Sequence, residues 1–167
     1  MTECHDGEAD EINTDLRRRE PHSQALRSAS RARDAKSRNW WLVDFWPQIP
    51  DDFIKVASAL GTQENAWLRQ VSGYWDMAAS LVLHGIINAD LFLEGGVSGE
   101  MVFLYAKLQP ILKDLREKMQ SPGLFRNVEK VLMQSETGRE RLKMVEARVA
   151  ARRKAMAESG VVAAKAS

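Results

Sequence analysis

Four side chains near the apolar centre of the sequence have the chemistry for proton transfer: Tyr74, Asp76, His84 and Glu100. Such a site needs a base that titrates near neutral pH and a partner that orients it, and a histidine with a carboxylate supplies both. On one helix, however, eight residues separate Asp76 from His84 by about 12 Å along the axis, so the two cannot touch. We therefore expect Asp76 at the rim of an apolar face and His84 beside exposed carbonyls at the helix C-terminus.

Other chemical motifs are absent or weak. The sequence contains no nucleophile elbow, no zinc-binding pair of helical histidines and no paired-carboxylate motif. The glycine-rich loop at residues 95–99 lacks the lysine of a phosphate-binding loop, and glutamates flank it. The Cys-His-Asp sequence at residues 4–6 offers too few ligands for a firm metal site. We expect no cofactor and no bound metal.

Three of the five tryptophans cluster with a phenylalanine, at Trp40, Trp41, Phe45 and Trp46. In one interpretation these rings form a patch that anchors a partner, because tryptophan buries a large area at a small entropy cost. In the other, they form a hydrophobic plug that fastens the N-terminal helix to the bundle. The spacing puts the rings on one broad side of a helix, which favours the plug.

The formal net charge of +1 hides a separation of charge along the chain. Residues 1–15 carry −6, residues 16–39 carry +6, residues 40–136 carry −4 and residues 137–167 carry +5. The basic arms at 16–39 and 137–154 could bind nucleic-acid phosphates without sequence preference. Against this, the isoelectric point of about 7.9 is below that of typical nucleic-acid-binding domains. The acidic segments could also pair with the arms within the molecule.

The C-terminal arm combines positive charge with a short apolar seam, formed by Leu142, Val145, Val149 and Met156. The seam is too short for a coiled coil but sufficient to dock on the bundle or to pair with another chain. We take the aromatic cluster as one candidate partner-binding set. The other consists of four arginines of this arm: Arg141, Arg148, Arg152 and Arg153.

Apolar residues recur at intervals of three and four residues throughout, and no segment alternates apolar and polar residues with period two over a useful length. The pattern predicts an all-α fold, an irregular bundle of five to six helices. Pro110 should kink or break its helix. The Ser121-Pro122 pair and the capping box from Thr137 to Glu140 should begin the last two helices. The predicted helices span residues 23–45, 50–60, 63–84, 98–120, 122–134 and 137–157, with a single turn at 88–92.

The composition divides the chain into a disordered tail at 1–22, one helical domain at 23–158 and a disordered tail at 159–167. Within the domain, we expect the packed core at 40–136 and a basic C-terminal helix at 137–158. A single cysteine excludes an internal disulfide and favours a reducing compartment. No apolar run is long enough to span a membrane, and the acidic N-terminus is unlike a targeting peptide. We expect a cytoplasmic protein.

The central stretch resembles a bacterial family of uncharacterised helical domains over about residues 40–135. The resemblance rests on packing-like motifs that read GTQENAW at 61–67, GYWDMAA at 73–79, LHG at 83–85 with Leu91-Phe92 after it, and YAKLQP at 105–110 leading to Arg116. It implies a helical fold and a bacterial cytoplasmic setting. No catalytic or ligand-binding residue carries over from it.

These observations favour a non-enzymatic helical module that contacts a protein partner, or a second copy of itself, through its aromatic N-terminal and basic C-terminal helices. The alternative is a nucleic-acid-associated accessory protein that uses both basic arms. An enzyme with chemistry around the four residues named first ranks third.

Overall fold

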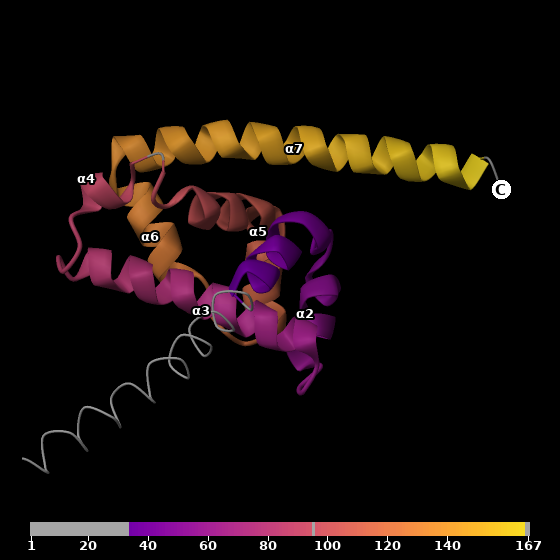
Figure 1. The fold of residues 1–167 in the computed structure, drawn as a ribbon, viewed down its shortest axis with the longest axis horizontal. Coiled ribbons are helices and arrows are strands. Elements are labelled where there is room, and N and C mark those ends of the chain that lie inside the picture. The colour runs from indigo at the N-terminus through magenta and orange to yellow at the C-terminus, as the bar shows by residue number, and fades with distance from the viewer. Residues whose placement is uncertain (1–33, 95, 166–167) are drawn as a thin grey trace, which may run out of the picture. The chain divides into compact units, whose positions relative to one another are not determined.

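The structure is a computed structural model that describes the backbone of residues 34–94 and 96–165, with side chains to Ser159. The chain divides into two units, Met1–Lys36 and Ser37–Ser167. In the first unit only residues 34–36 are described, and they are helical. The second unit contains a π-helix and six α-helices (Figure 1), which are η1 (Trp40–Asp44), α2 (Pro50–Ser58), α3 (Gln63–Leu83), α4 (Ala89–Phe92), α5 (Gly99–Lys118), α6 (Arg126–Gln134) and α7 (Glu136–Lys165).

The described residues contain no strand, so the predicted all-α fold is confirmed. These seven elements exceed the five or six expected, because the aromatic segment forms a π-turn of its own and residues 89–92 form a short helix. No described helix is both long and apolar enough to cross a membrane. The predicted tail at residues 1–22 lies outside the described residues, as does residue 95 of the glycine-rich loop.

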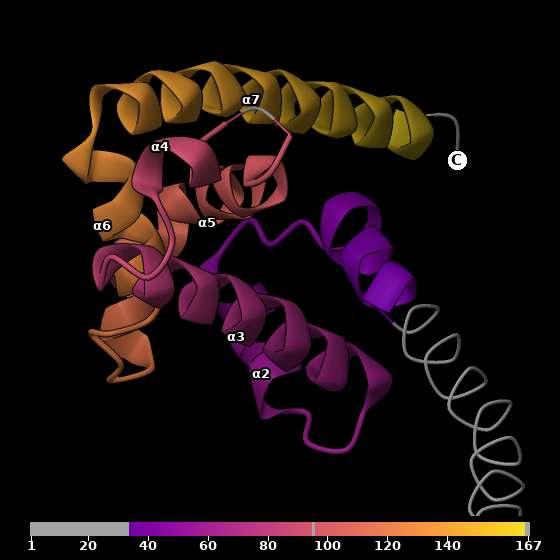
Figure 2. The ribbon, with the colours of Figure 1, turned by 60° about the vertical axis from the view of Figure 1, so that its left-hand side comes forward.

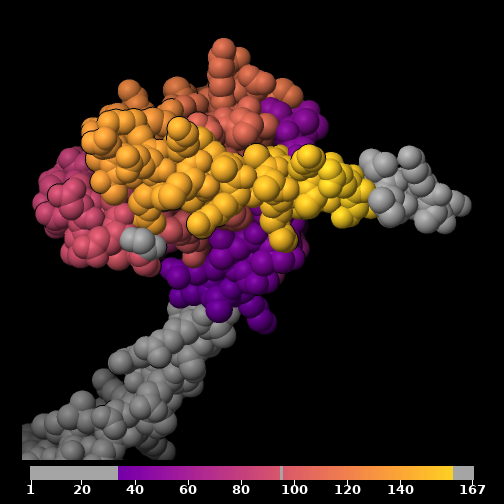
Figure 3. Space-filling model, turned by 90° about the horizontal axis from the view of Figure 1, so that it is seen from above, coloured from indigo at the N-terminus to yellow at the C-terminus, as the bar shows by residue number. Residues whose placement is uncertain are grey.

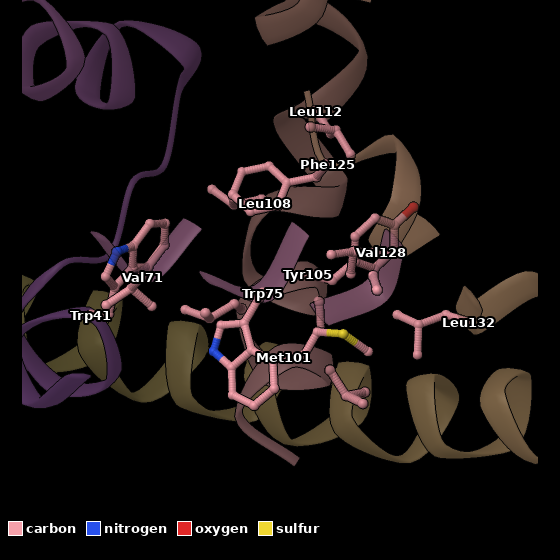
Figure 4. Packing of buried hydrophobic residues seen from close by; sticks show 14 of the residues in the cluster. Trp41, Val71, Trp75, Met101, Tyr105, Leu108, Leu112, Phe125, Val128 and Leu132 are labelled. Atoms are coloured by element: carbon pink, nitrogen blue, oxygen red, sulfur yellow. The ribbon is translucent and has the colours of Figure 1, made fainter. Parts of the chain in front are cut away.

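The core lies where α3, α5 and α6 meet. Figure 4 shows Trp75 of α3 beside Met101 and Tyr105 of α5, with Val128 of α6 close by. The predicted stripe along α5 is confirmed, since its five members are all buried: Val102, Tyr105, Leu108, Leu112 and Leu115. Each buried aliphatic or aromatic side chain of this kind contributes about 1.5–3 kcal/mol to folding.

Helix α7 packs along α5 and α6 (Figures 1 and 2). Leu142 and Val149 are buried against the core, and Val145 packs partly buried beside it. Three of the four seam residues therefore dock on the bundle, whereas Met156 is 41% exposed. From Lys154 to Ser159 every described side chain is exposed.

Thr62 caps α3, because its Oγ1 accepts a hydrogen bond from the Asn65 backbone at 3.2 Å. Asn88 caps α4 in the same way, with the Leu91 backbone as donor at 2.9 Å. Both caps agree with the sequence. The buried Asn65 side chain donates two further bonds to the last carbonyls of α2, at Val56 (3.0 Å) and Ala57 (2.8 Å).

The predicted break at Pro110 does not occur, since α5 runs through it from Gly99 to Lys118 and packing of the buried residues around it supports the helix despite the missing donor. Two predicted helix starts are wrong. Helix α6 begins at Arg126 and not at Pro122, because the backbone of Phe125 turns left-handed, with φ of 54°. Ser135 replaces Thr137 as the cap of α7, accepting a bond from Gly138 at 2.9 Å.

The two terminal predicted helices also differ from expectation. The helix expected at 23–45 is described only from residue 34 and changes to the π-helix η1 at residues 40–44. Helix α7 continues to Lys165, beyond its predicted end near residue 157. A glycine at 160 costs a helix only about 1 kcal/mol, so it need not end one.

Candidate functional site

Among the described residues, Lys107 of α5 is the charged side chain with no exposed surface. Its Nζ donates hydrogen bonds to the carbonyl oxygens of Trp41, at 2.5 Å, and of Phe45, where η1 ends. The same nitrogen lies 4.2 Å from the centroid of the Trp46 ring and 5.5 Å from that of Phe103. Two carbonyls and an aromatic face thus surround an ammonium group that has no carboxylate partner in the described part of the chain.

The pKa of Lys107 is lowered to about 7, mainly by burial and then by the positive charges of Arg153 and Arg152. Sequence reasoning missed this residue. The available signal was its position, because Lys107 is the only charged residue between Met101 and Leu112. The lysine is sealed from solvent, so its contacts fasten η1 to α5 and leave no surface for a substrate.

Three of the four aromatic candidates, Trp41, Phe45 and Trp46, contact this lysine. Trp40, Trp41, Phe45 and Trp46 are each at least nine-tenths buried. Trp40 stacks on Phe45 with ring centroids 4.5 Å apart, and Trp41 meets Phe45 edge-on at 5.1 Å. Their placement agrees with a hydrophobic plug and leaves little of these rings available to a partner.

Two of the four candidate arginines hold α7 to the rest of the unit. Arg141 donates to the carbonyls of Leu93 and Glu94 and to Ser98 Oγ. Arg153 donates to the carbonyl of Lys107 at 2.8 Å. It also bonds the Pro47 carbonyl at 3.0 Å and the side chain of Gln48. These arginines therefore position α7 at two points 12 residues apart.

The other two candidates, Arg148 and Arg152, are exposed. The guanidinium carbon of Arg152 lies 5.5 Å from the centroid of the Trp46 ring. No hydrogen bond or ion pair joins Arg148 to another described residue. Both side chains can thus contact a partner without first breaking a hydrogen bond or an ion pair to a described residue.

Helix α7 presents a stripe of one methionine and three alanines on the side opposite Leu142 and Val149. At 100° per residue, Met144, Ala147, Ala151 and Ala155 fall on this one side, and all four are exposed. Lys143 and Lys154 lie along one border of the stripe, and Arg148 and Arg152 along the other. These eight residues form what we call the outward face of α7. In Figure 3 α7 lies across the near side of the molecule, uncovered over this length.

The structure does not bring the four proton-transfer candidates into one pocket. Tyr74 is about half exposed, and the guanidinium carbon of Arg38 lies 5.6 Å from its ring centroid. Glu100 Oε2 also lies 3.7 Å from Arg38 Nε, and Glu100 Oε1 accepts a bond from the indole of Trp75 at 3.1 Å. Arg38 thus links Tyr74 and Glu100, with neither His84 nor Asp76 in that group.

His84 lies at the end of α3, where its Nδ1 is 2.8 Å from the carbonyl oxygen of Ser80. This is the arrangement that its position in the sequence predicts. Asp76 lies instead on a pocket of about 230 Å³ between the middle of α3 and the turn that precedes α6. Its Oδ2 accepts a hydrogen bond from the side-chain amide of Asn127 at 3.0 Å, while its buried Oδ1 has no partner among the described residues.

Within the described residues, no group of three metal-ligating side chains is close enough to hold an ion. The Cys-His-Asp sequence at residues 4–6 lies outside the described residues. Residues 16–33 of the N-terminal basic arm lie outside them as well. From the rest of that arm, Arg38 forms the ion pair with Glu100 described above.

No match to the chain was found among curated proteins or among solved structures. Residues 16–135 match a family described as Domain of unknown function (DUF4760). The match includes α2 to α6 and begins within the N-terminal basic arm, which the resemblance over residues 40–135 had left out. More than half of the sequence is covered, and the chain belongs to the DUF4760 family.

Proposed function

We propose that this chain is a non-enzymatic helical interaction module that binds an acidic helical segment of a partner protein on the outward face of α7. The observation that carries the proposal is the combination of exposure and charge on this face. Met144 is 57% exposed, and the three alanines beside it are exposed as well. Lys143, Arg148 and Lys154 form no ion pair with any described residue.

The side chains of this face suit a second helix. Alanines allow two helix axes to approach to about 8 Å, at the close end of the usual range. Basic residues on both borders of the stripe would meet carboxylates at the flanking positions of the incoming helix, as in paired helices with charged edges. A second copy of α7 is a poorer fit, because its basic borders would face basic borders.

The arginine contacts described above prepare α7 for binding. Arg141 attaches the helix before the stripe and Arg153 attaches it near the C-terminal end of the stripe, through bonds to Glu94 and Lys107 among others. A helix that is already fixed loses little conformational freedom on binding, so more of the contact energy appears as affinity. Two of the four candidate arginines therefore support the face, and Arg148 and Arg152 contact the partner.

Fluorescence anisotropy can test this with the full chain and two labelled helical peptides. One peptide has a Leu/Ala seam bordered by glutamates, and the other carries lysines in place of those glutamates. We expect saturable binding of the acidic peptide and no binding of the basic one. The double variant Arg148→Glu/Arg152→Glu should weaken binding of the acidic peptide at least tenfold. The matched control Lys113→Glu/Lys130→Glu changes the same charge on exposed sites of α5 and α6 and should bind normally.

A labelled duplex DNA serves as the third probe, because the same basic residues could contact phosphates. DNA binding that falls steeply with salt, without peptide binding, would replace this proposal with the nucleic-acid alternative. Equal binding of both peptides, or none, would also overturn it.

A further inference from the structure

The pocket beside Asp76 combines three local features that each cost stability. They are a glycine inside a helix, a phenylalanine with left-handed backbone and a buried carboxylate oxygen without a partner. Backbone strain and unsatisfied buried groups of this kind concentrate at binding sites. The three residues that carry them, Gly73, Phe125 and Asp76, line one pocket of about 230 Å³.

Gly73 lies in the middle of α3, where glycine is less stable than alanine. A Cβ built at this position meets no heavy atom within 4 Å, so no close neighbour demands the glycine. The same holds for Gly123, on the opposite wall. Both glycines line the pocket, so no side chain narrows it at these two positions.

Phe125 shapes the apolar wall. Its backbone φ of 54° lies in the left-handed region, which is strained for a residue with a Cβ, yet its side chain is buried. Leu124 continues this wall, and its carbonyl is held by Arg116 Nε at 3.0 Å. The turn is thus fixed in place, and the wall is preformed.

The polar groups of the pocket are acceptors. The Ser72 hydroxyl donates to the Leu68 carbonyl at 2.6 Å, which leaves its lone pairs free to accept. Asn127 donates to one oxygen of Asp76, and no cationic side chain lines the pocket. The carboxylate torsion of aspartate is broad and twofold, so either oxygen of Asp76 can turn toward the cavity.

We propose that this pocket binds a small alkylammonium group, with Asp76 as the anionic partner, Ser72 and Ser121 as hydroxyl acceptors, and Leu124 and Phe125 against the methylene chain. The volume suits a short free amine or the end of a lysine side chain on another molecule. The proposal does not depend on the outward face of α7, which involves none of these residues.

The test is a titration of the ¹⁵N-labelled full chain followed by two-dimensional NMR. Butylammonium and 1,4-diaminobutane represent free amines, and N-acetyl-lysine methylamide represents a lysine side chain. Butanol and butyrate are the neutral and anionic controls. We expect saturable shifts of the Gly73 and Gly123 amides with at least one ammonium probe, and no such shifts with either control.

Two variants locate the binding. Asp76→Asn should weaken it at least tenfold, and Gly73→Val should block it by filling the cavity, while Asp114→Asn on the exposed side of α5 should bind normally. Unchanged spectra outside the pocket show that each variant is folded. The proposal is wrong if butanol shifts the same amides as strongly, if Asp76→Asn retains the affinity, or if no ammonium probe saturates.

Discussion

The ammonium nitrogen of Lys107 lies 4.2 Å from the centroid of the Trp46 ring, and Trp46 lies two residues after the end of η1. With the carbonyls of Trp41 and Phe45, this ring takes the place that a carboxylate usually occupies beside a buried lysine. The arrangement ties an N-terminal segment to α5 across more than 60 residues of sequence. It also makes the stability of the domain depend on pH.

The free energy of unfolding should rise with pH above about 7. The unfolded chain keeps the Lys107 proton up to its ordinary pKa of 10.5, whereas the folded chain loses it near pH 7. Between these values the unfolded state binds more protons, so stability rises with pH, by at most about 1.4 kcal/mol per unit. Urea denaturation at pH 6, 7, 8 and 9 measures this slope.

A control is needed because other groups also titrate in this range. Lys107→Met should remove the slope above pH 7. If this variant does not fold, the ¹³Cε resonance of Lys107 in the wild-type chain gives the same information. A midpoint near pH 10 for that resonance would show that the carbonyls and rings around Lys107 do not destabilise its charged form.

Arg153 and Arg148 should differ in their effect on stability although both are arginines of α7. Arg153→Leu removes charged hydrogen bonds to the carbonyls of Pro47 and Lys107, and should cost about 3 kcal/mol. Arg148→Leu removes no such bond within the described chain and should change stability by less than about 0.5 kcal/mol. Thermal or urea unfolding of the two variants compares them. Equal effects would contradict the positioning role of Arg153.

Two glycine-to-alanine variants should change stability in opposite directions. Gly73→Ala places a Cβ in open space within α3 and should stabilise the chain by about 1 kcal/mol. Gly138→Ala places its Cβ 2.4 Å from the carbonyl oxygen of Leu132, so it should destabilise by about 2 kcal/mol. Urea midpoints measured side by side provide the comparison. A loss of stability in Gly73→Ala would mean that this glycine serves the fold and not the pocket.

The Asn65 side chain should be worth about 2 kcal/mol. It is buried and donates to the Val56 and Ala57 carbonyls, so Asn65→Ala leaves the Ala57 carbonyl without its described partner, while the Val56 carbonyl keeps the bond from the Ala59 amide at 3.2 Å. Asn88→Ala is the matched control, because it removes a single exposed cap and should cost about 1 kcal/mol. If the two variants lose the same stability, the end of α2 does not depend on Asn65.

The sequence was most informative where one residue determines local geometry. Thr62 and Asn88 cap their helices as predicted, since the capping bond forms within four residues of sequence. The boundaries that failed depend on distant contacts. Pro110 remains in a helix because α5 is packed on several sides, and Ser121-Pro122 does not start α6 because the chain turns once more at Phe125.

The candidate site was predictable only in part for the same reason. Spacing alone placed Arg141, Arg148, Arg152 and Arg153 on one basic helix, but which of them bond internally depends on carbonyls that lie more than 40 residues away. Lys107 gave a weak signal as one charge in an apolar run. The pocket beside Asp76 gave none, because its opposite walls are about 50 residues apart in sequence.

Photo-crosslinking in the native host tests the role of α7 most directly. A photoreactive residue in place of Ala151 lies at the centre of the outward face, and the same residue in place of the exposed Ala66 on α3 is the control. We expect cross-links from position 151 to an acidic, helix-forming segment of one protein, lost in the Arg148→Glu/Arg152→Glu background. Cross-links that are equal at both positions, or that lead to nucleic acid or to basic segments, would contradict the proposed function.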